Sequence, residues 1–241
     1  MSEIEIVKDL EALSARAAEL IADRIRGGRD PFRLALSGGG TPRGCYRHLA
    51  HLSQVPWEKV EIYLGDERFV PHDHPDSNYH MIRQTLLASQ TVTPRAIFAV
   101  PADGGPEDAA SAYEEILRQQ YGASRLRAGL PLFDLQLLGL GEDGHTASLL
   151  PGEPVLEERE RWVAVVPEGR REPRITLTYP ALESSRLTVF LASGAAKREM
   201  VARARAGDST IPAGRLKPQG DVIWLVDRAA AGIQDLNSII P

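Results

Sequence analysis

The chain has 241 residues, of which 43% are hydrophobic and 25% are charged, as in ordinary globular proteins. Its 28 basic and 33 acidic residues give a net charge of -5, which argues against binding to nucleic acids or anionic membranes. No apolar run approaches the roughly 20 residues that span a bilayer, and the N-terminus does not resemble a signal peptide. The single cysteine, Cys45, cannot form an internal disulfide. We therefore expect a cytoplasmic protein without membrane or nucleic-acid partners.

Apolar runs of strand length alternate with amphipathic stretches along the chain. In chain order, the sequence predicts a helix over 7–26, strands over 32–37 and 60–65, a helix over 106–122, a strand over 133–140, short strands over 162–169 and 174–184, a strand over 186–193, a helix over 195–207 and a strand over 221–226. Strands that alternate with helices predict a mostly parallel sheet covered on both faces. No linker or repeat divides the chain, so we expect one domain over residues 1–241.

The first candidate site is the turn that follows the first predicted strand. Its residues are Ser37, Gly38, Gly39, Gly40 and Thr41, with Pro42 opening a helix. Glycines let the backbone approach an anion closely, and the N–H groups at the start of a helix favour phosphate. The spacing matches neither the P-loop nor the dinucleotide-binding motif, so a nucleotide is not expected. The alternative is a tight turn that binds nothing.

Polar residues also follow the second predicted strand. Asp66 and Arg68 stand at its carboxyl end, where ligands bind in open α/β sheets, so both are candidates to contact a substrate. The loop 72–80 holds several histidines and aspartates but no standard zinc spacing, and we interpret it as a solvated loop rather than a metal site. Ser77 and Asn78 stand where the cap of the next helix is expected.

The most informative stretch, G-E-D-G-H-T, follows the strand over 133–140. His145 lies there in a glycine-rich turn, two residues after the carboxylate of Asp143. Histidine exchanges protons near neutral pH, so His145 is a candidate general base, and the alternative is a turn histidine that caps a helix. Arg174 and Lys197 stand at the ends of predicted elements. Each can neutralise a bound phosphate or remain a solvated surface charge.

Six segments taken together carry a family resemblance. They are SGGGTP, GDERFVP with the downstream DSN, LGLGEDGHTASLLPG, RITLT, GAAK and PAGRLKPQGDVIWLVDRAAA, in this order over nearly the whole chain. By these segments the sequence resembles the 6-phosphogluconolactonases. The resemblance implies a Rossmann-like three-layer α/β/α fold, similar to glucosamine-6-phosphate deaminase. It also implies hydrolysis of 6-phosphoglucono-1,5-lactone to 6-phosphogluconate in the oxidative pentose phosphate pathway, without metal or other cofactor.

The resemblance also implies roles for the candidate residues. The phosphate of the sugar lactone would bind the loop from Ser37 to Thr41 together with Arg174 and Lys197. His145 would activate water, while Asp66 and Arg68 would contact the sugar and help to stabilise charge at the carbonyl. The donors for the oxyanion stay open between Arg68 and the backbone N–H groups of the glycine turns. We expect the protein to act as a monomer.

Three other functions fit the sequence less well. In the deaminases a glutamate follows the D-G-H turn and works with the histidine, whereas Leu150 stands at the matching position here. A sugar-phosphate sensor that regulates transcription would need a DNA-binding module, for which we see no segment before the first helix. A serine esterase would need a G-x-S-x-G elbow, and the sequence has none.

Overall fold

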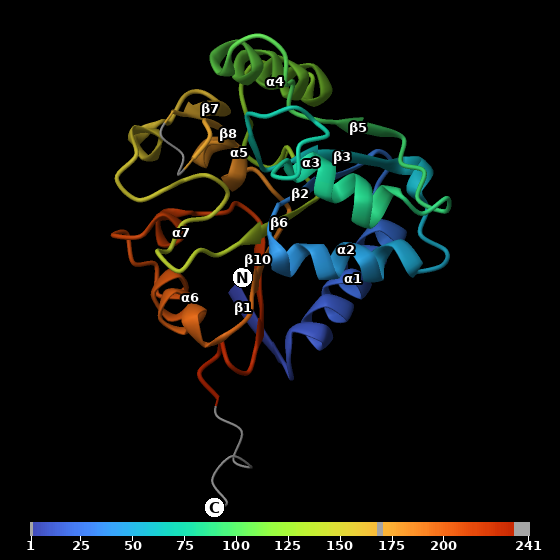
Figure 1. The fold of residues 1–241 in the computed structure, drawn as a ribbon, viewed down its shortest axis with the longest axis vertical. Helices are drawn as coiled ribbons and strands as arrows, with labels where there is room; N and C mark the ends of the chain where they lie inside the picture. The colour runs from blue at the N-terminus through green and yellow to red at the C-terminus, as the bar shows by residue number, and fades with distance from the viewer. Residues whose placement is uncertain (1, 168–170, 234–241) are drawn as a thin grey trace, which may run out of the picture.

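The centre of the structure is a parallel β-sheet (Figure 1). The computed structural model describes residues 2–167 and 171–233. Within them, seven strands pair in the order β1-β10-β9-β6-β2-β3-β5, and each pairing is parallel. The strands are β1 (Ser2–Val7), β2 (Phe32–Leu36), β3 (Val60–Leu64), β5 (Ala96–Phe98), β6 (Leu135–Gly139), β9 (Leu187–Ala192) and β10 (Asp221–Asp227). The predicted mostly parallel sheet is confirmed.

Helices cover both faces of this sheet. Figure 1 shows α1 (Leu10–Gly27) and α2 (Gly40–His51) on one side, and α6 (Arg198–Arg205) and α7 (Pro212–Arg215) on the other. The remaining helices are α3 (Asn78–Ile82), which continues as a π-helical turn over Arg83–Leu87, α4 (Pro106–Tyr121) and α5 (Tyr179–Glu183). Single 3₁₀ turns occupy Trp57–Lys59, Pro154–Glu157 and Ala195–Lys197. The predicted three-layer α/β/α fold is therefore confirmed.

The first strand of the sheet differs from the prediction. The sequence predicts a helix from residue 7, but residues 2–7 form β1, which pairs with β10 at the edge of the sheet. The helix α1 begins only after Asp9, whose carboxylate accepts a hydrogen bond of 2.9 Å from the N–H of Ala12. A partner strand from the far end of the chain stabilises β1, and the alternation of polar and apolar residues over 3–6 was the local signal for it.

A second, smaller sheet consists of three antiparallel strands. Its order is β4 (Asp66–Arg68), β8 (Arg174–Leu177) and β7 (Val163–Val166). The register places Arg68 directly opposite Arg174, and α4 packs on β7 and β8. This sheet therefore brings together two candidate site residues that are far apart in the sequence.

The two short predicted strands of this region are only partly correct. The strand predicted over 174–184 ends at Leu177, and α5 follows with Pro180 in its first turn, a position that proline favours. The strand predicted over 162–169 corresponds to β7, and its residues 168 and 169 lie outside the described residues.

The strand order reverses between β2 and β6. From β2 the chain continues to β3 and β5, and from β6 it continues in the other direction to β9 and β10. Loops that leave the carboxyl ends of two such strands diverge, and the crevice between them is where open α/β sheets bind ligands. The glycine turn after β2 and the His145 turn after β6 therefore flank one crevice.

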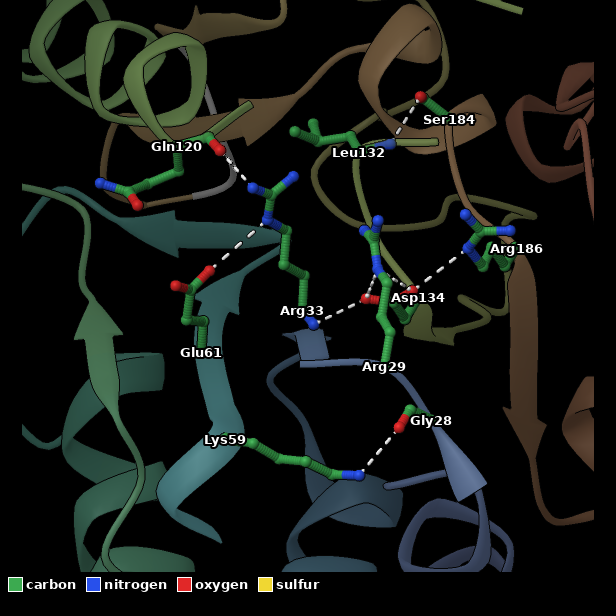
Figure 2. Close-up of polar contacts among 10 residues, drawn as sticks. All are labelled: Gly28, Arg29, Arg33, Lys59, Glu61, Gln120, Leu132, Asp134, Ser184 and Arg186. Atoms are coloured by element: carbon green, nitrogen blue, oxygen red, sulfur yellow. Dashed lines mark hydrogen bonds and ion pairs between the residues drawn. The ribbon is translucent and has the colours of Figure 1, made fainter. Parts of the chain in front are cut away.

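Paired charges hold the strands at the opposite, amino-terminal end of the sheet (Figure 2). The buried carboxylate of Asp134, just before β6, accepts hydrogen bonds from Arg29 Nε at 3.0 Å and from the N–H of Arg33 at 2.9 Å. It also pairs with Arg186 Nε at 3.2 Å, and Arg33 Nε lies 3.5 Å from Glu61 in β3. Removing one member of such a cluster leaves buried charge uncompensated. This end of the sheet is thus fixed by its own network, away from the crevice.

Candidate active site

The crevice contains a cavity of about 300 Å³. It lies at the carboxyl ends of the strands, between the loops that follow β2, β3, β6 and β9. All the site residues predicted from the sequence line it, namely Ser37, Gly38, Gly39, Gly40, Thr41, Asp66, Arg68, His145, Arg174 and Lys197. The structure therefore brings the four candidate segments together into one site.

The glycine turn joins the end of β2 to the start of α2. Gly39 has a φ of 107°, in the region that glycine adopts without strain. A Cβ at Gly38 would lie 1.9 Å from Oδ1 of Asn78, so only glycine fits there. The Oγ of Ser37 is buried and has no hydrogen-bond partner among the described residues. The backbone N–H groups at the start of α2 have no partner within the helix and therefore suit an anionic ligand.

The carboxylate of Asp66 is held on both of its oxygens. Oδ2 accepts a hydrogen bond of 2.6 Å from the hydroxyl of Ser148, and Oδ1 accepts one of 3.3 Å from the side-chain amide of Asn78. Asn78 also donates to the backbone carbonyl of Asp66 at 2.9 Å. All three residues are buried. Asp66 is therefore fixed in position at the cavity wall, suited to accept a hydrogen bond from a substrate hydroxyl.

Neither Asn78 nor Ser148 was predicted as a functional residue. Asn78 was interpreted as part of a helix cap, and α3 does begin there, with Ser77 accepting from the N–H of His80 at 3.0 Å. The cap explains the backbone, while the side chain of Asn78 lines the cavity. The available signal was that D-S-N and T-A-S belong to the segments that carry the family resemblance.

A buried glutamate anchors the loop that carries Arg68. Glu67 is 2% exposed, and its carboxylate accepts four hydrogen bonds, from the N–H groups of residues 68, 78 and 79 and from the hydroxyl of Ser77. Burial raises the pKa of Glu67, although these hydrogen bonds act in the opposite direction. The guanidinium of Arg68 in turn donates to the carbonyl of Asp76 at 2.7 Å. The loop therefore holds Arg68 at the cavity.

The histidine of the D-G-H turn is paired with the carboxylate before it. Nδ1 of His145 lies 2.5 Å from Oδ1 of Asp143. Because a carboxylate only accepts, this contact places the proton of a neutral imidazole on Nδ1 and leaves Nε2 as the basic nitrogen. A Cβ at Gly141 would lie 2.0 Å from Nδ1, so the glycine makes room for the ring. The carboxylate of Asp143 therefore orients the ring of His145, an arrangement that suits a base.

The rest of this turn explains why the histidine is not a helix cap. No helix begins at His145, since Thr146 and Leu149 form a bridge within a further turn and the next helical turn of the described chain starts at Pro154. Ile211 packs so closely on Gly144 that a Cβ added to Gly144 would lie 2.8 Å from the Cβ of Ile211. The N–H of Ala213 also donates a hydrogen bond of 2.9 Å to the carbonyl of Gly144. The turn is thus supported from outside the crevice.

The two predicted cations border the same cavity. Arg174 Nη1 lies 3.4 Å from the Ser148 hydroxyl that also holds Asp66. Lys197 ends the 3₁₀ turn after β9, and this turn is held by Asp227, which accepts from Ser193 Oγ at 2.5 Å and from the N–H of Gly194 at 3.0 Å. Two positive charges beside a glycine turn form a suitable anion site.

Two histidines of the loop 72–80 form polar contacts with neighbouring backbone groups. His72 Nε2 lies 2.7 Å from the carbonyl of Val100, and His74 Nδ1 accepts from the N–H of Asp76 at 3.2 Å. Over residues 2–167 and 171–233, no three His, Cys, Asp or Glu side chains are grouped to hold a metal ion. In the same part of the chain, no helix is long and apolar enough to cross a membrane.

The chain is similar to proteins of known family and structure. The model of the family described as "Glucosamine-6-phosphate isomerases/6-phosphogluconolactonase" matches residues 8–224. A protein of Nostoc sp. named 6-phosphogluconolactonase is 37% identical over 94% of this chain and 96% of its own length. The solved structure of 6-phosphogluconolactonase from Trypanosoma cruzi is 28% identical, with a TM-score of 0.82 over 96% of each chain.

A monomeric glucosamine-6-phosphate deaminase of known structure is also similar, at 25% identity and a TM-score of 0.77 over 96% of this chain and all of its own. The fold is therefore common to lactonases and deaminases. The match to the family model extends over far more than half of the chain and includes each segment that lines the cavity up to Lys197. The chain belongs to the glucosamine-6-phosphate isomerase/6-phosphogluconolactonase family.

Proposed function

We propose that this protein hydrolyses 6-phospho-D-glucono-1,5-lactone to 6-phospho-D-gluconate, the second step of the oxidative pentose phosphate pathway. One observation carries the proposal: His145, which is paired with Asp143, lines the same cavity as the glycine turn and the cations Arg174 and Lys197. A substrate with a phosphate at one end and a reactive carbonyl at the other suits this arrangement. The name of the Nostoc relative agrees with it.

In the proposed mechanism the phosphate binds the N–H groups of residues 37–41 together with Arg174 and Lys197. His145 Nε2 takes a proton from a water molecule, and the water oxygen attacks the lactone carbonyl. The resulting oxyanion collapses, the bond from the carbonyl carbon to the ring oxygen breaks, and the ring oxygen takes up the proton. Asp66 orients a sugar hydroxyl, and Arg68 stabilises the negative charge that develops at the carbonyl.

The deaminase reaction is not favoured by the structure of the D-G-H segment. Leu150 occupies the position at which the sequence comparison with deaminases expects a glutamate. It is 6% exposed, packs in the hydrophobic core and does not line the cavity. A leucine cannot transfer protons, so ring opening of an amino sugar would lack its second acid-base group.

We further infer that the protein acts as a monomer in the cytoplasm and binds no nucleic acid. The net charge of -5 supports the absence of a nucleic-acid surface. Light scattering coupled to size-exclusion chromatography tests the monomer directly, since a dimer would elute with twice the chain mass of 26.4 kDa.

Generating the lactone in place tests the proposed function. Glucose-6-phosphate dehydrogenase supplies the unstable lactone from glucose 6-phosphate, and its disappearance is followed with and without this protein. We expect an acceleration over spontaneous hydrolysis that depends on protein concentration, and no ammonia release from glucosamine 6-phosphate. Lactone loss at the spontaneous rate would refute the proposal.

A further inference from the structure

A buried tyrosine hydroxyl is bonded to both backbone groups of the first residue of the glycine turn. Tyr46 belongs to α2 and is 0% exposed. Its hydroxyl accepts a hydrogen bond of 3.0 Å from the N–H of Ser37 and donates one of 2.7 Å to the carbonyl of Ser37. Tyr46 does not line the cavity, so it can affect a ligand only through the turn.

These two bonds act where the sheet stops holding the chain. β2 ends at Leu36, and its pairing with β3 ends at the same residue, so Ser37 lies beyond the ladder. A buried backbone N–H or carbonyl without a partner is costly, and the tyrosine supplies both partners with one group. Burial raises the pKa of Tyr46 well above its usual value, so the hydroxyl keeps the proton that it donates.

The far side of the turn is held as well. The Asn78 side chain packs so closely on Gly38 that no Cβ fits between them. The glycine turn is thus held between Asn78 on one side and the Tyr46 hydroxyl at its first residue. The Ser37 hydroxyl, buried at the cavity wall without a partner among the described residues, is left with hydrogen-bonding capacity for a ligand.

We propose that Tyr46 is a positioning residue, which holds the backbone of Ser37 so that the turn 37–41 keeps the shape that binds the substrate's phosphate. This inference rests on the proposed function and assigns a role that the chemistry of the site does not itself require. It makes Tyr46 a determinant of the preference for phosphorylated over unphosphorylated lactones.

The chain offers a matched control for this device. Tyr121, at the end of α4, is also buried, and its hydroxyl donates to the carbonyl of Leu130 at 2.7 Å and accepts from the N–H of Arg127 at 2.9 Å. None of these residues lines the cavity. The replacements Tyr46→Phe and Tyr121→Phe therefore remove equivalent pairs of bonds, one at the site and one remote from it.

The test measures kcat/KM for 6-phosphogluconolactone and for unphosphorylated gluconolactone in the wild type and both variants. Tyr46→Phe should lower the ratio of the two values about three- to tenfold, mainly through KM for the phosphorylated substrate, as expected for the loss of one or two neutral hydrogen bonds. Tyr121→Phe should leave the ratio unchanged. Because a ratio does not depend on the amount of folded protein, partial unfolding of a variant does not hide the result.

An unchanged ratio in Tyr46→Phe, or an equal fall in both variants, would overturn the inference. Binding of inorganic phosphate gives a second test that does not depend on catalysis. Its dissociation constant, measured by isothermal titration calorimetry, should increase by a similar factor in Tyr46→Phe and stay unchanged in Tyr121→Phe. If the wild type failed to hydrolyse the lactone, the proposed function would fall, while the phosphate titrations would still decide whether Tyr46 shapes the anion site.

Discussion

Replacing His145 with asparagine is the sharpest test of the proposed chemistry. Asparagine is smaller than histidine, so it fits the space that Gly141 provides for the ring, and it keeps a polar group next to Asp143. It cannot accept a proton from water. The proposed anion site lies on other segments that line the cavity, at residues 37–41, 174 and 197, so substrate binding should persist while proton transfer is lost.

The expected loss follows from the role of the pair. A positioned general base typically contributes about 10²–10⁴-fold, which corresponds to roughly 2.7–5.4 kcal/mol of the activation barrier at about 1.36 kcal/mol for each factor of ten. The 2.5 Å contact with Asp143 indicates that the imidazole is oriented. We therefore expect kcat to fall by this factor in His145→Asn with KM nearly constant, and to fall less in Asp143→Asn, which keeps the base.

The assay is the coupled lactone assay with the spontaneous rate subtracted, together with circular dichroism to show that the variants fold. The wild-type rate should also fall in acid, because a protonated imidazole cannot accept a proton, and the residual rate of His145→Asn should lack this dependence. A folded His145→Asn protein with near wild-type kcat would refute the assignment and would make Asp66 the next candidate base.

Three further predictions concern the anion site, metals and acid stability. Arg174→Ala and Lys197→Ala should each raise KM about ten- to a hundredfold in steady-state assays, the loss of a charge-assisted bond worth roughly 1.5–3 kcal/mol; equal efficiency on both lactones in the wild type would contradict this site. Activity should survive exhaustive EDTA treatment, and a loss reversed by one metal would show that the loop 72–80 was misinterpreted. Hydrogen bonds, the strongest of them from the Thr210 hydroxyl, lower the pKa of Asp208 from 3.8 to about 2. The ionised carboxylate therefore stabilises the folded state above pH 3.8, and this stabilisation is lost as the pH falls towards 2. The Tm of Asp208→Asn should accordingly lie below that of the wild type near neutral pH and approach it near pH 2 in thermal melts, whereas a constant difference would argue against this linkage.

Much of the site could be predicted because its signals are local. Parallel strands read as short apolar runs, and in such a sheet the residues after each strand meet at one edge. The residues after β2, β3 and β6 could therefore be selected without knowing the strand order. The roles assigned to these residues remain predictions, as does the single domain over 1–241.

The tertiary structure alone decided the contacts between distant segments. Asp66 and Ser148 are 82 positions apart, Arg68 meets Arg174 only through the small antiparallel sheet, and β1 exists as a strand because β10 offers it a partner. Tyr46 reads in the sequence as one more apolar residue of a helix. Hydrogen bonds of this kind depend on which distant segments the fold brings together, and the spacing of residues along the sequence does not show this. The sequence thus determined which chemical groups are present at the ends of the strands, and the fold determined which of them hold the others in place.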